Sequence, residues 1–147
     1  MIRAEGKQMR CRLAFALALI VVLVPTILYG TKKGEALVER YRAAHMARDV
    51  EALKALVYWE GASERTREII EQRLIRNLNL EIKIIEFRPL TGEEKFENLG
   101  YRPNLEPVGW LAMFFKPPDG DSRFFSKSFI VGKKDGKYLI TVAEPAR

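Results

Sequence analysis

The chain has 147 residues, a formal net charge of +6, one cysteine and one histidine. A single cysteine excludes an internal disulfide, and one histidine with one cysteine excludes the usual zinc ligand sets. The sequence contains no Gly-rich phosphate loop and no G-x-S-x-G elbow, so the common nucleotide-binding and hydrolase signatures are absent. We therefore expect no cofactor and no metal site.

Residues 1–12 form a basic tail, predicted to be cytoplasmic, with four basic residues and one acidic residue: Arg3, Lys7, Arg10, Arg12 and Glu5. This tail carries +3 of the formal +6, which leaves +3 for the rest of the chain. The charges of that remainder are mixed in sign, whereas nucleic-acid-binding domains gather lysine and arginine on one face or stripe. We expect no nucleic-acid partner.

Residues 13–31, LAFALALIVVLVPTILYGT, carry no charge over 19 residues. At about 1.5 Å rise per residue, a helix of this length covers about 28 Å, close to the hydrocarbon thickness of a bilayer. Such a helix satisfies its own backbone hydrogen bonds in lipid. Buried helices of soluble proteins rarely stay apolar on all sides for this length. The segment is therefore predicted to be a transmembrane anchor.

A cleaved secretory signal is the alternative interpretation of the same segment. The basic tail would be its n-region and residues 13–24 its h-region. The best cleavage position places Gly30 last before the cut and bulky Leu28 two residues earlier, which matches the A-x-A-like pattern poorly. Both interpretations place residues 32–147 outside the cytoplasm, since the basic tail favours the inner side. Cys11 precedes the apolar run, whereas a lipoprotein cysteine follows one, so we expect no lipoprotein-type anchor there. An incidental thiol is the preferred interpretation, and S-acylation of this juxtamembrane cysteine is the alternative.

Three helices are predicted at the start of the outer domain. The first runs from Lys32 to about Ala47 and repeats its less polar residues every three or four positions, at Leu37, Tyr41, Ala44 and His45. Asp49 is the predicted N-cap of a second, short helix, VEALKALV. Ser63 is the predicted cap of a third, ERTREIIEQRLIRNL, whose main apolar residues lie four apart at Ile70, Leu74 and Leu78.

After Asn79 the pattern changes from a helical period to alternation. We predict four strands, near residues 80–87, 108–116, 122–132 and 137–143. Asp135-Gly136 between the last two is the strongest short-range hairpin signal, and Pro117 to Gly120 marks a turn between the second and third. A cluster of lysines falls at the predicted hairpin tip: Lys133, Lys134 and Lys137. Strands joined by turns indicate an antiparallel sheet.

The second predicted strand is apolar in both of its alternating sets. One set contains Trp110 and Phe114, and the other contains Leu111, Met113 and Phe115. Such a strand is covered on both faces, or lines a cavity or a contact surface. The third strand is more one-sided, so the sheet should curl around the helices. The predicted fold class is α+β, with three helices on a curved antiparallel sheet of about four strands, all in one domain of residues 32–147.

Residues 89–107, PLTGEEKFENLGYRPNLEP, form a long connection between the first two predicted strands. Long connections in compact domains tend to be functional or mobile. One interpretation is a lid over a pocket or a contact arm for a partner. The other is an extended hairpin whose ends pair further out.

The order of these elements resembles the nuclear-transport-factor-2-like superfamily, whose cystatin-like α+β cone wraps a curved sheet around a long helix. The resemblance covers residues 33–143, and its most specific stretches are AAHMARDVEALKALV and DGKYLITV. It implies a pocket at the wide end of the cone. Members of the superfamily include isomerases, dehydratase-like enzymes, polyketide cyclases and membrane-anchored subunits of secretion machines, so the fold does not choose a function.

Tyr41 and His45 are the candidate catalytic residues. They lie four residues apart on the first helix, which can bring a phenol and a proton acceptor into one pocket. A single histidine near the end of an amphipathic helix is more often bonded locally, and no carboxylate pair has a spacing that specifies a reaction. These two residues support one functional hypothesis, a small lyase or isomerase.

The other and preferred hypothesis is a non-enzymatic binding or scaffold domain held at the membrane by residues 13–31. It would contact a partner protein, a second copy of itself or a small apolar ligand. The doubly apolar strand and the scarcity of catalytic residues motivate it. The candidate contact residues are Trp59, Tyr101, Arg102, Trp110 and Phe114.

Overall fold

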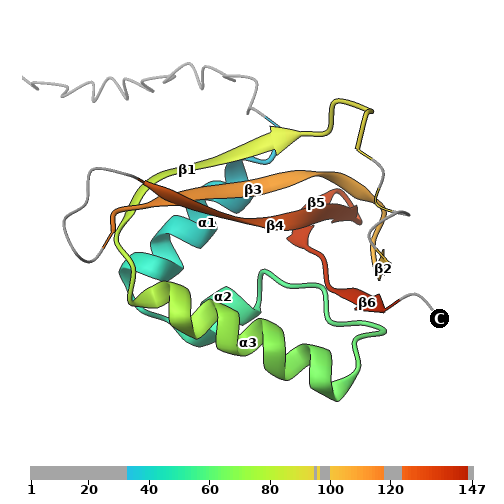
Figure 1. Ribbon diagram of the computed structural model, residues 1–147, viewed down its shortest axis with the longest axis horizontal. Coiled ribbons are helices and arrows are strands. Elements are labelled where there is room, and N and C mark those ends of the chain that lie inside the picture. Colours follow the sequence, from blue (N-terminus) through green and yellow to red (C-terminus); the bar gives the residue numbers. More distant parts are fainter. Residues whose placement is uncertain (1–32, 95, 97–99, 118–123, 146–147) are drawn as a thin grey trace, which may run out of the picture.

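The computed structural model of the protein describes residues 33–94, 96, 100–117 and 124–145. In chain order its elements are α1 (Glu35–Met46), α2 (Val50–Lys54), α3 (Glu64–Leu78), β1 (Ile82–Pro89), β2 (Tyr101–Pro103), β3 (Pro107–Phe115), β4 (Phe125–Lys134), β5 (Lys137–Ile140) and β6 (Ala143–Pro145). The fold is α+β as predicted, with helices first and antiparallel strands after them (Figure 1). The predicted anchor, residues 13–31, lies outside the described residues, within which no helix is long and apolar enough to cross a bilayer.

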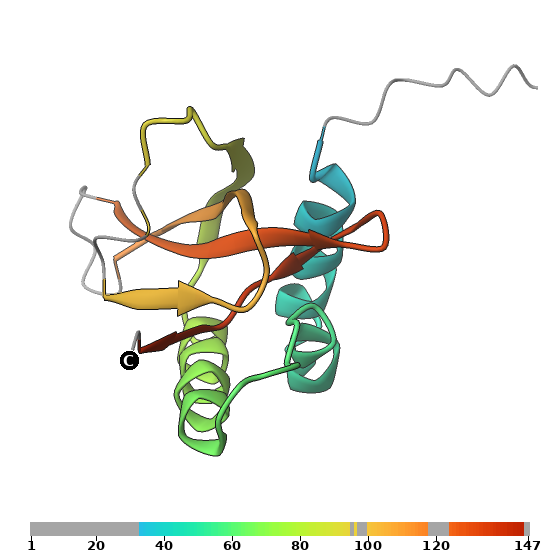
Figure 2. The same ribbon diagram turned by 90° about the vertical axis from the view of Figure 1, so that its right-hand side faces the viewer.

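The main sheet curls strongly around the helices. Its strands follow the order β1-β3-β4-β5, and each neighbouring pair is antiparallel. α1 contacts both edge strands, β1 and β5, which requires the sheet to bend around that helix. The result is a half-barrel with the helices on its concave side (Figures 1 and 2). The predicted curvature is therefore confirmed.

α2 and α3 begin at their predicted caps. Asp49 Oδ1 accepts a hydrogen bond from the Ala52 amide at 2.9 Å, and Ser63 Oγ accepts one from the Thr66 amide at 3.3 Å. These bonds satisfy amides that lack a partner within the first helical turn.

α1 begins later than the predicted Lys32, at a glycine. Gly34 precedes the helix with a φ of 79° and no side-chain cap. A Cβ atom at this position would overlap the Phe87 ring of β1. The left-handed backbone and the close approach of Phe87 both require glycine here.

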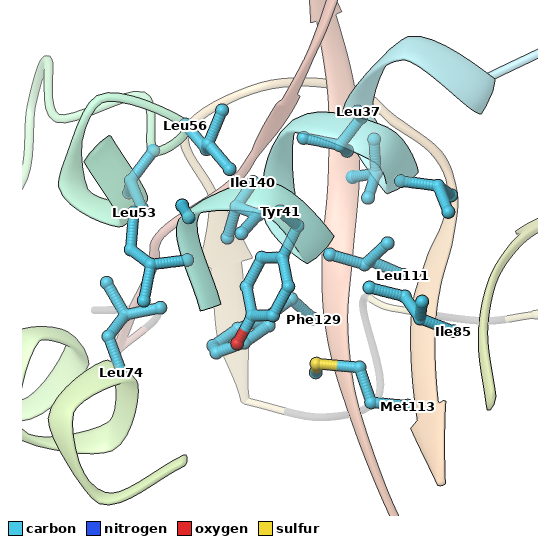
Figure 3. Close-up of a cluster of buried hydrophobic side chains, with 14 of the residues drawn as sticks. Leu37, Tyr41, Leu53, Leu56, Leu74, Ile85, Leu111, Met113, Phe129 and Ile140 are labelled. Carbon is cyan, nitrogen blue, oxygen red and sulfur yellow. The ribbon is translucent and has the colours of Figure 1, made fainter. Parts of the chain in front are cut away.

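The space between the helices and the concave face of the sheet is filled by side chains. The predicted apolar faces of α1 and β3 meet there, and several of their large residues are 0% exposed: Tyr41, Leu111, Met113 and Phe115. Leu53 of α2 and Leu74 of α3 close the cluster from the other side (Figure 3).

The convex face of β3 is only partly covered. The Phe96 ring lies 5.3 Å from the Trp110 ring, measured between centroids. The Arg88 guanidinium lies 5.2 Å from the centroid of Phe114. Both aromatic residues are half-buried, so the strand is fully covered on its concave face and partly covered on its convex face, which leaves a contact surface there as the other predicted alternative.

The prediction of about four strands is incomplete. Residues 101–103 within the long connection form β2, which pairs antiparallel with β6 in a second, two-stranded sheet. The last predicted strand, residues 137–143, is divided, because β5 ends at Ile140 and β6 starts at Ala143. β4 runs from Phe125 to Lys134, two residues beyond the predicted end at 132, and residues 122–123 of the predicted strand lie outside the described residues. Part of the long connection is therefore a strand paired with the C-terminal segment.

Asn104 fixes this second sheet to the body of the domain. Its Nδ2 donates to the carbonyl oxygens of Tyr58 and Glu60 at 2.7 and 2.8 Å. Its Oδ1 accepts from the Val142 amide at 2.9 Å. One side chain thus joins the segment between α2 and α3 to the end of the chain.

The hairpin between β4 and β5 forms as predicted. Asp135 and Gly136 have φ angles of 49° and 78°, and positive values at both positions are those of a type I′ turn. The turn places Lys133 opposite Tyr138 and Lys134 opposite Lys137.

Candidate functional site

Tyr41 and His45 are neighbours on α1, as the sequence predicts, but they have different surroundings. Their rings stack with centroids 6.3 Å apart and an interplanar angle of 22°. Tyr41 is 0% exposed, and its hydroxyl oxygen lies in the core between Leu74 and Met113 (Figure 3). His45 is 9% exposed and lines a surface groove. The two side chains therefore do not enter one pocket together.

The orientation of His45 is set by α3. Its Nε2 lies 3.0 Å from the backbone oxygen of Asn77. A carbonyl oxygen can only accept, so Nε2 must carry the proton of this bond. In the neutral ring Nδ1 is then a hydrogen-bond acceptor.

The Tyr41 hydroxyl group has no hydrogen-bond partner among the described residues, and the same holds for Asn77 Nδ2. Burial raises the pKa of Tyr41 above its ordinary value. The Asn77 amide and the Arg73 guanidinium lie near enough to oppose this rise in pKa, although no well-aligned hydrogen bond joins Tyr41 to either. The phenol is therefore neutral at neutral pH.

Two cations lie beside Asn77, at the contact between α3 and β4. Lys127 Nζ donates to Asn77 Oδ1 at 2.9 Å, and Arg73 Nη2 donates to the Ser128 carbonyl at 2.8 Å. Removal from water lowers the pKa of both cations. Arg73 also lies 4.6 Å from the centroid of the Phe129 ring. These contacts tie α3 to the sheet, and Asn77 is the residue that joins α1, α3 and β4.

A groove of about 370 Å³ lies between the end of α1 and the start of β1. We call it the α1–β1 groove, and its lining residues are Arg42, His45, Met46, Glu81, Ile82, Lys83 and Ile85. Ile82, Ile85 and Met46 supply its apolar surface. Glu81 and Lys83 form an ion pair at its rim, and this hydrogen bond from Lys83 lowers the pKa of Glu81. In the part of the chain that the structure describes, Arg42 has no ion-pair partner.

The predicted contact residues do not gather at one place. Trp59 lies between α2 and α3, where its Nε1 donates to the Lys54 carbonyl at 2.9 Å and the Arg67 guanidinium covers its ring at 5.6 Å. Trp110 and Phe114 lie on the convex face of β3. Tyr101 and Arg102 are exposed on β2.

Sequence reasoning missed most of the groove. Of its lining residues only His45 was singled out, because the others are ordinary members of a helix and a strand. The neighbourhood of Arg42, Glu81 and Lys83 depends on how α1 packs against β1, and no local pattern reports that packing. The role of Asn77 was missed for the same reason.

No group of three or more histidine, cysteine, aspartate or glutamate side chains within the described residues is placed to hold a metal ion. Comparison with known proteins gives no family for the chain, because no protein-family model, no curated protein and no solved structure matches it. The geometry of the molecule is therefore the basis for any functional statement.

Proposed function

We propose that residues 32–147 are a binding domain, held outside the cytoplasm by membrane segment 13–31, whose α1–β1 groove takes a small amphipathic molecule with an acidic head group. The observation that carries this proposal is the groove itself, an apolar surface beside an arginine and the single histidine of the chain.

The size and surface of the groove suit a small ligand. Small-molecule sites have volumes of about 300–1,000 Å³, and the groove has about 370 Å³. Ile82, Ile85 and Met46 offer contacts to an apolar body. Met46 is 77% exposed, so covering it with a ligand removes apolar surface from water.

The polar side of the groove favours an anionic head. The Lys83 cation is already paired with Glu81, whereas Arg42 has no ion-pair partner among the described residues. A guanidinium can bind a carboxylate through two parallel hydrogen bonds. His45 Nδ1 adds an acceptor for a protonated head group, or a donor when the ring is charged.

The lyase or isomerase interpretation has less support. It needs Tyr41 and His45 in one pocket, and the Tyr41 ring is 0% exposed with a raised pKa. The acid and base groups that line the groove beside His45 are Arg42, which stays protonated, and the ion-paired Glu81 and Lys83. The arrangement supports binding better than proton transfer.

Membership of the nuclear-transport-factor-2-like superfamily stays a proposal. Three helices followed by a strongly curled antiparallel sheet support it. The resemblance implies a pocket at the wide end of the cone, and the α1–β1 groove is the candidate for the corresponding opening in this chain.

The test uses the full chain in lipid nanodiscs with ¹³C-labelled isoleucine and methionine methyl groups. Hexanoate is the probe, because it combines a short apolar tail with a carboxylate. We expect saturable shifts of the Met46, Ile82 and Ile85 methyl signals, with no shift at Ile69 on α3. Hexylammonium should bind more weakly than hexanoate.

The matched variants are Arg42→Gln in the groove and Arg40→Gln on the same helix outside it. Loss of one charge-assisted contact should weaken hexanoate binding by about tenfold in Arg42→Gln and leave it unchanged in Arg40→Gln. Equal binding by all three proteins, or shifts at Ile69 as large as those at Ile85, would refute the groove as the site.

A further inference from the structure

The start of the described chain lies beside the β4–β5 hairpin. Gly34 approaches the Phe87 ring so closely that a Cβ atom would overlap it. The Phe87 and Tyr138 rings meet edge to face, with centroids 5.3 Å apart. Lys133 Nζ lies 5.5 Å from the centroid of the Tyr138 ring. These contacts therefore connect Gly34, near the start of the described chain, to the hairpin through Phe87 and Tyr138.

This end of the molecule carries a set of exposed lysines, which we call the basic collar: Lys33, Lys133, Lys134 and Lys137. Two acidic residues lie next to them in the chain, Glu35 and Asp135, so these six residues together carry +2. Within the described residues none of the four lysines belongs to an ion pair. Their charges can therefore attract anionic groups outside the protein.

The chain between Gly34 and the predicted membrane segment is short. Segment 13–31 ends three residues before Gly34, and three residues of extended chain reach at most about 10 Å. At physiological salt, charges act on each other over about 8 Å. If segment 13–31 spans the bilayer, the first turn of α1 and its neighbouring hairpin are held close to the lipid headgroups.

We infer that the basic collar lies on anionic phospholipid headgroups of the bilayer that residues 13–31 enter. The inference rests on the membrane attachment in the proposed function. Lysines beside a membrane segment are attracted to anionic lipid. The α1–β1 groove lies at the other end of α1, at Arg42, His45 and Met46, so this contact would orient the groove away from the lipid.

The experiment measures how close two positions lie to the headgroups. The full chain, carrying Cys11→Ser, receives one dye through Lys134→Cys in the collar or through Glu68→Cys on α3. Figures 1 and 2 both place α3 at the opposite end of the molecule from the start of the described chain. The proteins are reconstituted in vesicles of phosphatidylcholine, alone or mixed with phosphatidylglycerol, that contain a headgroup-attached nitroxide quencher.

We expect the dye at position 134 to be quenched more than the dye at position 68, and more strongly when phosphatidylglycerol is present. Charge reversal by Lys133→Glu with Lys137→Glu should remove the dependence on phosphatidylglycerol. The matched reversal on α3, Arg65→Glu with Arg76→Glu, should leave it intact. In the protein without these reversals, raising the salt to about 1 M should also remove the dependence on phosphatidylglycerol, because charges then act over only about 3 Å.

Three results would overturn the inference, and they differ. Equal quenching at positions 134 and 68 in a chain that resists alkaline carbonate extraction would refute the collar and leave the anchor in place. Extraction of the chain by carbonate would refute the attachment on which both proposals rest. Binding of duplex DNA that the collar reversal abolishes, without quenching at position 134, would assign the collar to nucleic acid instead.

Discussion

The hydroxyl group of Tyr41 is a buried polar group without a partner among the described residues. Leaving such a group unsatisfied costs about 1–3 kcal/mol. The Tyr41 ring itself makes favourable contacts. It stacks on His45, and its centroid lies 6.3 Å from the centroid of the Phe129 ring. Position 41 therefore needs an aromatic ring more than it needs a phenol.

Tyr41→Phe should leave the free energy of unfolding unchanged or raise it by up to about 1 kcal/mol. The pKa of Tyr41 is raised by burial, so above about pH 10 the unfolded tyrosine loses its proton while the folded one keeps it. The wild-type protein should then lose stability as the pH rises beyond about 10, and Tyr41→Phe should lose less. Denaturant titrations at several pH values measure both effects.

Tyr101→Phe is the control for this substitution, since Tyr101 is 55% exposed. It should follow the wild-type alkaline curve. A loss of stability in Tyr41→Phe of about 2 kcal/mol or more would show that the hydroxyl group makes a hydrogen bond in solution.

Gly34 and Gly61 form a matched pair at the residue scale. Both have positive φ, 79° and 77°, but a Cβ atom at position 34 would overlap the Phe87 ring, whereas position 61 has no atom within 4 Å. Gly61→Ala should cost about 1 kcal/mol, the penalty of a left-handed alanine. Gly34→Ala should cost that and the overlap, about 3 kcal/mol in total. Equal costs for the two variants, measured by denaturation, would contradict the packing of α1 on β1.

Single residues could be predicted from sequence only where a local rule applies to them. Asp49, Ser63 and the Asp135-Gly136 turn follow from capping and turn chemistry, and all were confirmed. The spacing of Tyr41 and His45 correctly predicted neighbouring rings. It could not predict that one ring enters the core and the other a groove, because α3 and β3 decide that.

At the scale of elements, α3 is stabilised by a residue from the far end of the chain. Glu144 in β6 accepts hydrogen bonds from the amide and the hydroxyl group of Ser63, at 2.7 and 3.2 Å. The Ser63 amide bond is the main reason why the pKa of Glu144 is lowered. The carboxylate also lies at the N-terminus of α3, where the helix dipole favours a negative charge.

Glu144→Gln should lower stability at neutral pH, because the charge at the start of α3 is lost. Because the pKa of Glu144 is lowered in the folded protein, its carboxylate stabilises the fold above the unfolded-state pKa. This stabilisation is lost as the pH falls through the folded-state pKa. The stability of the variant should therefore depend less on pH between about 5 and 3 than that of the wild type. Thermal unfolding across this range measures the difference.

Glu39→Gln, an exposed position on α1, should keep the wild-type dependence on pH. Parallel pH curves for Glu144→Gln and the wild type would contradict the role given to the carboxylate.

Elements with a strong period of their own were predicted, and elements that exist through distant pairing were not. The amphipathic helices and the alternating strands β1, β3 and β4 carry their pattern within a few residues. β2 and β6 are three residues each and depend on pairing with each other in a sheet of their own, although β3, β4 and β5 lie between them in the chain. A pattern of three residues contains too little information to show such a pairing.

At the scale of the whole molecule, the curl of the sheet determines which spaces are left for a ligand. Because α1 contacts both β1 and β5, the concave side is closed by Tyr41, Leu111 and Met113, each 0% exposed. The opening that remains near His45 lies at the margin, between α1 and β1. The proposed membrane segment and the proposed contact of the basic collar with lipid would place this opening on the side away from the bilayer.

The most direct test of the binding proposal is the position of bound hexanoate, read from nuclear Overhauser effects between its protons and the protein methyl groups in nanodiscs. The account predicts effects to the Ile82 and Ile85 methyl groups and none to the methyl groups of Leu111 and Met113. Effects to Leu111 and Met113 would show that the ligand enters the interior of the half-barrel, and would contradict the account.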